Sequence, residues 1–498
     1  MLFNSIDFLI FFPIVTLIYF MIPDKVKYLW LLVVSYYFYM CWNVTYIVLI
    51  FTSTIITYLS GLGIERIKKL EVSEEGKVKY KKWIVAGSLI SNLGILFYFK
   101  YTNFVLDIVE NICLNLKIRI SIPDFDIMLP VGISFYTFQA LSYTIDVYRD
   151  EIYAEKNFFR YALFVSFFPQ LVAGPIERSK NLLKQLAEPK KIDFETARDG
   201  FFLMLWGFFL KIVLADRIAI LVDTVYSDYI TYEGYYIVVA TILFAVQIYC
   251  DFSGYSTIAM GTAKILGISL MENFEAPYLS TTVATFWRKW HISLTSWFKD
   301  YLYIPLGGSR KGIIRKYFNK IFVFLVSGLW HGADFSFVIW GGLNGLYQVI
   351  GEVIMPIRDK VVKFLRLNRE SFGHKVFGVV TTFVLVDFSW IFFRASDFRT
   401  ALSMIKSMCT VGNIGILFDG SLYECGLSAH NFILMLVCIV LLLFVDICKY
   451  KGICIRECVF RQDYWFRWLF VAASVWVILV FGIWGPAFDK AAFIYFQF

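Results

Sequence analysis

Long apolar runs follow one another along most of this chain, and only short gaps between them carry charge. Just 17% of the 498 residues are charged, whereas an ordinary soluble domain has roughly a quarter. A helix needs about 20 apolar residues to cross a bilayer, so many spans fit into this length. The pattern excludes a soluble enzyme, a disordered chain and a single-span receptor. It predicts an all-α, polytopic membrane protein in contact with membrane lipids.

The apolar runs define the segments that we expect to cross or enter the bilayer. These segments are 5–22, 28–42, 45–62, 83–100, 102–116, 129–147, 158–174, 200–224, 235–250, 321–350, 376–393, 431–447 and 466–486. We expect 321–350 to consist of two broken segments, and Gly254–Ile268 to be a re-entrant or partly buried helix. Because broken backbone at membrane depth needs cover from protein or a water-filled cavity, an internal cavity is predicted.

The distribution of lysine and arginine predicts the orientation of the chain. Three short gaps, 65–82, 358–375 and 449–467, are rich in both residues and are expected on the cytoplasmic side. Three spans precede the first gap, so both the N-terminus and a C-terminal tail, 487–498, are expected outside the cytoplasm. From the length of the chain and of a single span, we predict about 11 transmembrane helices. We expect a single integral-membrane domain over 1–498, with its core motifs at about 128–395.

The charge and cysteine content point to neither nucleic acid nor metal. The net charge of +8 comes from lysines and arginines scattered over the short gaps, so no basic domain is present. The nine cysteines fit no zinc-binding spacing, and several lie in apolar runs where a thiol packs as a small hydrophobe. We therefore expect no nucleic-acid partner, no metal and no bound cofactor.

Two of the four histidines lie where chemistry is plausible. His331 lies within 321–350, an apolar run in which an imidazole needs either a partner or a function. Glycines around it, such as Gly328 and Gly332, leave room for a close helix or a substrate. Burial there keeps the ring neutral, the form that a general base requires. A purely structural buried histidine is the alternative.

His291 lies in an aromatic and basic stretch, 285–310. One helical face is predicted from the spacing of Trp287, Trp290, Leu294, Trp297 and Tyr301. The stretch is too charged to cross the bilayer, so we expect an amphipathic helix at the interface or in a funnel. On this helix His291 turns toward the apolar side, either as a functional group or as a filler of the aromatic face.

Most familiar catalytic signatures are missing from the sequence. It contains no G-x-S-x-G elbow, no Walker loop and no H-E-x-x-H motif. Two carboxylates, Asp251 and Asp387, lie within apolar runs. Each is expected either to orient a polar group or to form a hydrogen bond between helices.

The two histidine motifs together resemble the membrane-bound O-acyltransferase (MBOAT) family. The first reads F-W-R-K-W-H and ends at His291, and the second reads G-L-W-H-G around His331, 40 positions later. Three further segments strengthen the resemblance: Phe167–Leu186, Tyr249–Ile268 and Tyr301–Arg310. They are similar to the bacterial branch with the alginate O-acetylase membrane subunit, the peptidoglycan O-acetyltransferases and, more distantly, the teichoic-acid D-alanylation subunit.

The resemblance implies a helical bundle in the bacterial cell membrane. The bundle surrounds a central funnel, which an acyl donor enters from the cytoplasm and an acceptor from outside. It gives His331 the position of the essential histidine of the family and His291 that of the second. Candidate residues lining this funnel are Trp287, Trp290, Trp330 and Asp251. The implied reaction is the transfer of an acetyl group from acetyl-CoA, or another acyl thioester, to a cell-wall polysaccharide or exopolysaccharide. Relatives commonly work with an extracytoplasmic partner of the SGNH type.

The C-terminal tail carries one further candidate. Phe493, Tyr495 and Phe498 resemble the F-x-Y-x-x-F ending of the small accessory peptide in teichoic-acid D-alanylation. There the tyrosine looks like the first acyl acceptor, so Tyr495 is a candidate acyl carrier. An aromatic anchor at the membrane interface is the alternative.

Two other functions compete with acetyl transfer. D-alanyl transfer of the teichoic-acid type is an alternative within the enzyme class. A secondary transporter of a polar solute is an alternative from a different class, because broken helices and intramembrane polar residues suit it. The absence of an inverted repeat favours the acyltransferase.

Overall fold

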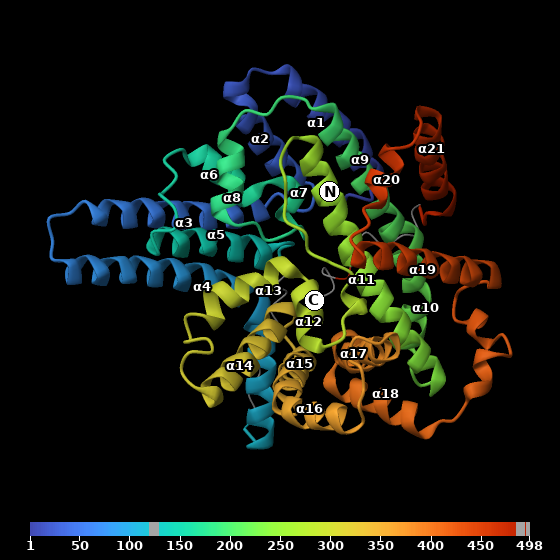
Figure 1. The fold of residues 1–498 in the computed structure, drawn as a ribbon. Coiled ribbons are helices and arrows are strands. Elements are labelled where there is room, and N and C mark those ends of the chain that lie inside the picture. The colour runs from blue at the N-terminus through green and yellow to red at the C-terminus, as the bar shows by residue number, and fades with distance from the viewer. Residues whose placement is uncertain (119–128, 485–493, 495–498) are drawn as a thin grey trace. The chain divides into compact units, whose positions relative to one another are not determined.

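The computed structural model describes residues 1–118, 129–484 and 494 (Figure 1). Within these residues every regular element is a helix, as the apolar runs predict. The chain forms two compact units. The first consists of Met1–Met204 and Ile258–Met271, and the second consists of Leu205–Thr257 and Glu272–Phe498.

Several described helices are long and apolar enough to cross a membrane. Six qualify alone, and a seventh qualifies if the bent pair Phe335–Val353 and Met355–Phe364 is counted as one span. This agrees with a multi-pass membrane protein, while the predicted number of about 11 crossings stays a prediction. Polar side chains within the spans find partners in neighbouring helices. Ser53 Oγ donates to Asn92 Oδ1 at 2.5 Å, and Tyr161 Oη donates to Thr57 Oγ1 at 2.7 Å.

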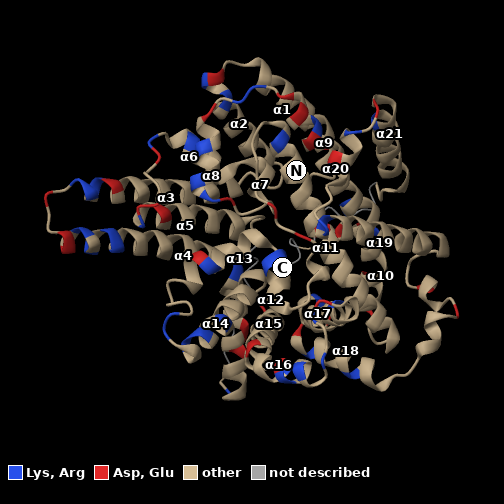
Figure 2. Cartoon of the chain, viewed as in Figure 1, with Lys and Arg blue, Asp and Glu red and all other residues tan. Residues whose placement is uncertain are grey.

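The first unit is built from the N-terminal helices. They are α1 (Ile6–Met21), η1 (Asp24–Val26), α2 (Lys27–Met40), α3 (Tyr46–Lys68), α4 (Glu74–Asn115), α5 (Ile133–Tyr148), α6 (Phe158–Ser166), α7 (Phe168–Leu171), α8 (Ser179–Ala187) and most of α9 (Phe194–Phe208). Helices α3, α4 and α5 pack side by side (Figure 1). Charged residues gather at the connection between α3 and α4, as Figure 2 shows.

Two predicted breaks in the spans are absent from the structure. The expected separate spans 83–100 and 102–116 are one 42-residue helix, α4, which begins where Ser73 accepts a hydrogen bond from the Gly76 amide. Only Tyr101 lies between them, and neither it nor the preceding Lys100 is a helix breaker. Likewise 235–250 and Gly254–Ile268 belong to one helix, α11 (Tyr235–Ile265), followed by a turn. Of the two forms expected for Gly254–Ile268, the structure shows the buried helix and not the re-entrant segment.

Gly254 serves close packing rather than a break in α11. A Cβ at this position would lie 2.9 Å from the carbonyl oxygen of Gly207, in the part of α9 that belongs to the second unit. Only a glycine allows two helix backbones to approach this closely. Gly254 therefore marks a contact between helices.

The second unit contains the remaining helices. They are the π-helix η2 (Phe209–Ala215), α10 (Asp216–Ser227), most of α11, η3 (Pro277–Leu279), α12 (Val283–Lys289), α13 (Ile292–Phe298), the π-helix η4 (Lys299–Tyr303), α14 (Ile313–His331), α15 (Phe335–Val353), α16 (Met355–Phe364), α17 (Phe372–Arg394), α18 (Phe398–Thr410), η5 (Ile414–Leu417), η6 (Ser421–Glu424), α19 (Ala429–Tyr450), α20 (Ile455–Phe460) and α21 (Tyr464–Phe481).

The predicted break within 321–350 is confirmed. Helix α14 ends at His331, and α15 begins at Phe335 after Asp334, whose side chain accepts a hydrogen bond from the Ser336 amide. The two helices form a tight hairpin (Figure 1). A Cβ at Gly328 would clash with the carbonyl oxygen of Phe337 in α15. This glycine therefore allows the close approach of the two helices.

Candidate active site

The second unit brings the two candidate histidines together. His331 is the last residue of α14, and His291 lies at the corner between α12 and α13. Their ring centroids are 6.5 Å apart, and the residues are 6% and 1% exposed. Two imidazoles from positions 40 residues apart in the sequence thus share one buried site.

The expected amphipathic helix through His291 is wrong, because the chain bends sharply there. Helix α12 ends at Lys289, and His291 adopts a left-handed backbone conformation with φ 44° and ψ 55°. Helix α13 follows and passes into the π-helix η4. The aromatic residues predicted on one helical face are therefore divided between helices of different direction.

Asn273 holds this corner through its backbone and its side chain. Its carbonyl oxygen accepts a hydrogen bond from the Ile292 amide at 3.0 Å, and its Oδ1 accepts one from the Ser293 amide at 3.2 Å. Its Nδ2 donates to Ser256 Oγ on α11 at 3.2 Å. A left-handed non-glycine residue costs about 1–3 kcal/mol, and it persists only where its surroundings hold it. The hydrogen bonds of Asn273 stabilise this backbone conformation of His291.

Aromatic rings enclose both histidines. Trp330 lies beside both rings, with centroids 4.9 Å from His331 and 6.1 Å from His291. Trp340 and Phe393 contact His331 edge-on at 5.1 and 5.4 Å. Phe252 of α11 contacts His291 at 4.6 Å. The histidines are therefore buried among apolar aromatic side chains.

The predicted tryptophans Trp287 and Trp290 line the aromatic layer next to this pair. Trp287 packs on Trp340 at 5.5 Å, and its Nε1 donates to Asn344 Oδ1 at 3.1 Å. Trp290 packs on Trp390 of α17 at 5.3 Å. Asn344 is a buried residue of this layer that was not predicted, although an amide within an apolar run was a signal visible in the sequence.

Asp251 pairs with lysine rather than with either histidine. Its carboxylate lies 2.5 Å from Lys211 Nζ, and the same ammonium donates to Asp216 at 2.8 Å. The Asp251 carboxylate also accepts a hydrogen bond from the Ile494 amide at 2.9 Å. Tyr495, the candidate acyl carrier, lies outside the described residues.

Burial defines what the histidine pair can do chemically. It lowers the pKa of His291 to about 3, because the charged imidazolium loses its hydration. His291 is therefore a neutral imidazole at physiological pH and a weak proton acceptor. Among the described residues, no group of three or more histidine, cysteine or acidic side chains is placed to hold a metal ion.

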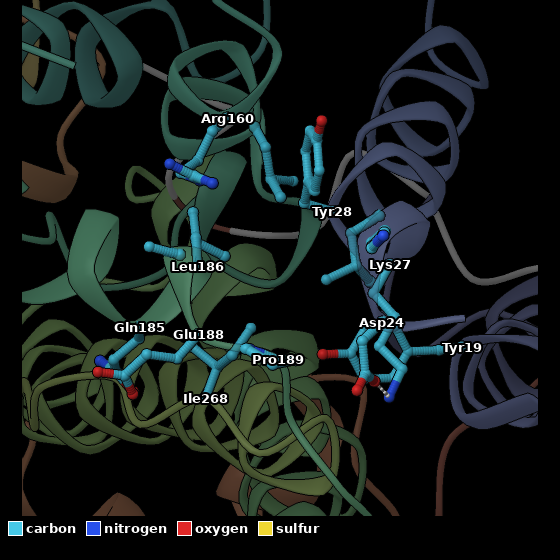
Figure 3. A pocket seen from close by; sticks show the side chains of 14 residues that line it. Tyr19, Asp24, Lys27, Tyr28, Arg160, Gln185, Leu186, Glu188, Pro189 and Ile268 are labelled. Carbon is cyan, nitrogen blue, oxygen red and sulfur yellow. Dashed lines mark ion pairs between the residues drawn. The ribbon is translucent and has the colours of Figure 1, made fainter. Parts of the chain in front are cut away.

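A cavity of about 320 Å³ lies in the first unit, at the connection between α1 and α2 (Figure 3). Its buried lysine, Lys27, forms an ion pair with Asp24 at 2.6 Å and donates to the Lys190 carbonyl oxygen at 2.7 Å. Arg160, in the same lining, lies 3.3 Å from Glu155. Because neighbouring groups balance these charges, the lining gives no sign of the charge of a ligand.

Comparison with known proteins gives consistent matches over most of the chain. The model of MBOAT, the membrane-bound O-acyltransferase family, matches residues 18–381. A probable alginate O-acetylase, AlgI, of Pseudomonas putida is 35% identical over 83% of this chain and 81% of that protein. The peptidoglycan O-acetyltransferase of Helicobacter pylori is 31% identical over 84% and 81%. The teichoic acid D-alanyltransferase of Bacillus subtilis is 26% identical over 56% and 71%.

Replacing Asn273 with Ala should loosen the corner that buries His291. The variant loses the side-chain acceptor of the Ser293 amide and the donor to Ser256, so we expect diethyl pyrocarbonate to modify His291 several-fold faster. Peptide-resolved mass spectrometry measures this rate. Asn319→Ala, which removes another buried amide from the same unit, is the control and should leave the rate unchanged. Equal protection of His291 in wild type and Asn273→Ala would contradict the assigned role.

Proposed function

Because the chain belongs to the membrane-bound O-acyltransferase family and is thus a multi-pass membrane acyltransferase, we propose that it O-acetylates a cell-wall polysaccharide or exopolysaccharide. The acetyl group comes from acetyl-CoA or a related thioester. The observation that carries this proposal is the pair of buried imidazoles, 6.5 Å apart in an aromatic surrounding. The greater similarity to proteins named for O-acetylation than to a D-alanyltransferase favours acetyl as the transferred group.

His331 is the proposed general base. It takes the proton of the attacking hydroxyl while the oxygen forms a bond to the thioester carbonyl carbon. When the tetrahedral intermediate collapses, the carbon–sulfur bond breaks and the leaving thiolate receives the proton from His331. The aromatic surrounding excludes water, so hydrolysis of the thioester does not compete. No nucleophilic serine or cysteine of this chain is required for direct transfer.

His291 is the proposed orienting residue. A pKa of about 3 makes it a poor proton acceptor, but a neutral imidazole still donates one hydrogen bond. Directed at the carbonyl oxygen, such a donor stabilises the negative charge that develops during attack. The 6.5 Å between the ring centroids allows both residues to act on one small acyl group.

The proposed transfer crosses the membrane. The basic gaps place the donor side in the cytoplasm, and both termini lie on the acceptor side. An extracytoplasmic partner of the SGNH type delivers the group to the polysaccharide. Tyr495 is the proposed carrier between them: its phenol attacks the thioester, His331 takes the proton, and the aryl ester is then passed on to the partner. The aryl ester is a suitable intermediate because it stays activated for a second transfer.

Replacing His331 with Ala should lower acetyl transfer from acetyl-CoA to a hydroxyl acceptor by roughly 10²–10⁴-fold, the usual contribution of a general base. His291→Ala should be slower than wild type but retain residual activity. Purified protein in detergent with labelled acetyl-CoA measures both rates.

His374→Ala is the matched control for these two variants, since that histidine lies at the start of α17, away from the site. It should match wild type. Full turnover in His331→Ala protein with a normal size-exclusion profile would refute the assignment of the base. Competition between acetyl-CoA and a D-alanyl carrier protein separates the two acyl donors.

Replacing Tyr495 with Phe should stop delivery to the polysaccharide, because the change removes only the hydroxyl that carries the acyl group. Wild-type protein given acetyl-CoA without a partner should show an acetyl adduct on its C-terminal peptide by mass spectrometry, and the variant should not. Tyr153→Phe, at an exposed tyrosine, is the control and should behave as wild type. Normal acetylation of the polysaccharide by Tyr495→Phe would leave the tail as an interfacial anchor only.

A further inference from the structure

Three charged side chains form a cluster inside the second unit that the proposed reaction does not use. Lys211 lies in the π-helix η2, Asp216 begins α10, and Asp251 lies in α11. Each side chain is 3% exposed. The ammonium contacts both carboxylates, at 2.8 and 2.5 Å. The cluster has one positive and two negative formal charges, so its carboxylate oxygens can accept further hydrogen bonds.

A buried charge cluster of this kind needs an explanation beyond stability. Desolvation of buried ion pairs often cancels their attraction, so apolar residues of similar volume would stabilise the unit equally well. The π-helix that carries Lys211 is a rare element that occurs frequently at functional sites. The contacts of the cluster show which segment it serves.

The C-terminal segment binds to these same elements at three described points. Arg217 Nη2 donates to the Phe481 carbonyl oxygen at 2.7 Å, and the Ile483 amide donates to the Ile212 carbonyl oxygen at 3.0 Å. The Ile494 amide then donates to Asp251 Oδ2 at 2.9 Å, and Ile494 itself is 1% exposed. The described residues after α21 are thus anchored on η2, α10 and α11.

Asp251 lies close to the histidine site along α11. The next residue, Phe252, is the ring that packs on His291 at 4.6 Å. A residue bound to the Asp251 carboxylate is therefore held on the helix that also supports His291. Ile494 directly precedes Tyr495 in the sequence.

We propose that the Lys211–Asp216–Asp251 cluster is a latch that holds Ile494, and that Asp251 thereby fixes the residue next to the proposed acyl carrier Tyr495 in the sequence. Lys211 contacts one oxygen of the Asp251 carboxylate, Oδ1, and so fixes the carboxylate in place. The other oxygen, Oδ2, accepts the hydrogen bond from the Ile494 amide. The part of this proposal that concerns Tyr495 rests on the proposed acyl-carrier function, whereas the latch itself does not.

The hydrogen bond from the Ile494 amide to Asp251 has a carboxylate acceptor, so it is stronger than a hydrogen bond between two neutral groups. A hydrogen bond to a charged group typically changes a local equilibrium by roughly ten-fold to a hundred-fold. Removal of the carboxylate should therefore release Ile494 measurably without unfolding the helices. Asp251→Asn keeps an oxygen at this position and loses the charge, so it should fall between wild type and Asp251→Ala.

The test uses a cysteine at the latched position itself. In the full-length Ile494→Cys protein, the rate of maleimide labelling is measured on the tryptic peptide 491–498, which contains no native cysteine. Labelling should be slow with Asp251 intact and about ten-fold or more faster in the Asp251→Ala background. Asp387→Asn removes another intramembrane carboxylate, has no contact with Ile494 among the described interactions, and should leave the slow rate unchanged.

The outcomes separate the latch from a merely structural ion pair and from the acyl-carrier function. Equal, slow labelling with and without Asp251 overturns the latch, because a structural role alone changes thermal stability but not the exposure of position 494. Fast labelling in the Asp251-intact protein also overturns it. If Asp251→Ala accelerates labelling while Tyr495→Phe retains full transfer, the latch stands as an anchor of the tail and only the carrier function fails.

Discussion

The left-handed backbone at His291 is the constraint on which the site depends. The chain does not continue through 283–303 as one helix, because α12 ends before this residue and α13 begins after it. The segment around Asn273 instead takes up the amides of Ile292 and Ser293, so the chain turns and the ring faces His331. The bend interrupts the regular helical hydrogen bonds, and it fixes the position of the His291 side chain. Strained backbone at functional sites commonly serves to hold a side chain in the position that the function needs.

Close helix packing provides the second half of the site. The glycines of α14 and α15 allow a hairpin whose backbones approach within contact distance, and His331 lies at its turn. Trp340 and Phe393 then fill the space around the ring. Bulkier residues in place of Gly328 would separate the helices and admit water, which would expose a thioester to hydrolysis.

Sequence reasoning predicted part of this arrangement and missed part for identifiable reasons. Helical class and the break before Phe335 follow from apolar runs and glycine spacing, which are local. The corner at His291 was missed because its cause, Asn273, is a contact between segments that no periodicity reveals. Lys211 lies within a predicted span, so the sequence alone indicates that this lysine needs a partner. The identity of that partner, Asp251 on another helix, requires the fold.

As a member of an acyltransferase family, this membrane protein transfers an acyl group rather than carrying a solute. The most direct measurement uses sealed proteoliposomes of oriented protein, with acetyl-CoA labelled on the acetyl group at the face of the basic gaps and a hydroxyl acceptor at the other face. We expect covalent label on the acceptor or on the C-terminal peptide, with free CoA left on the donor side. Passage of a polar solute across the membrane with no covalent acetyl product would contradict it.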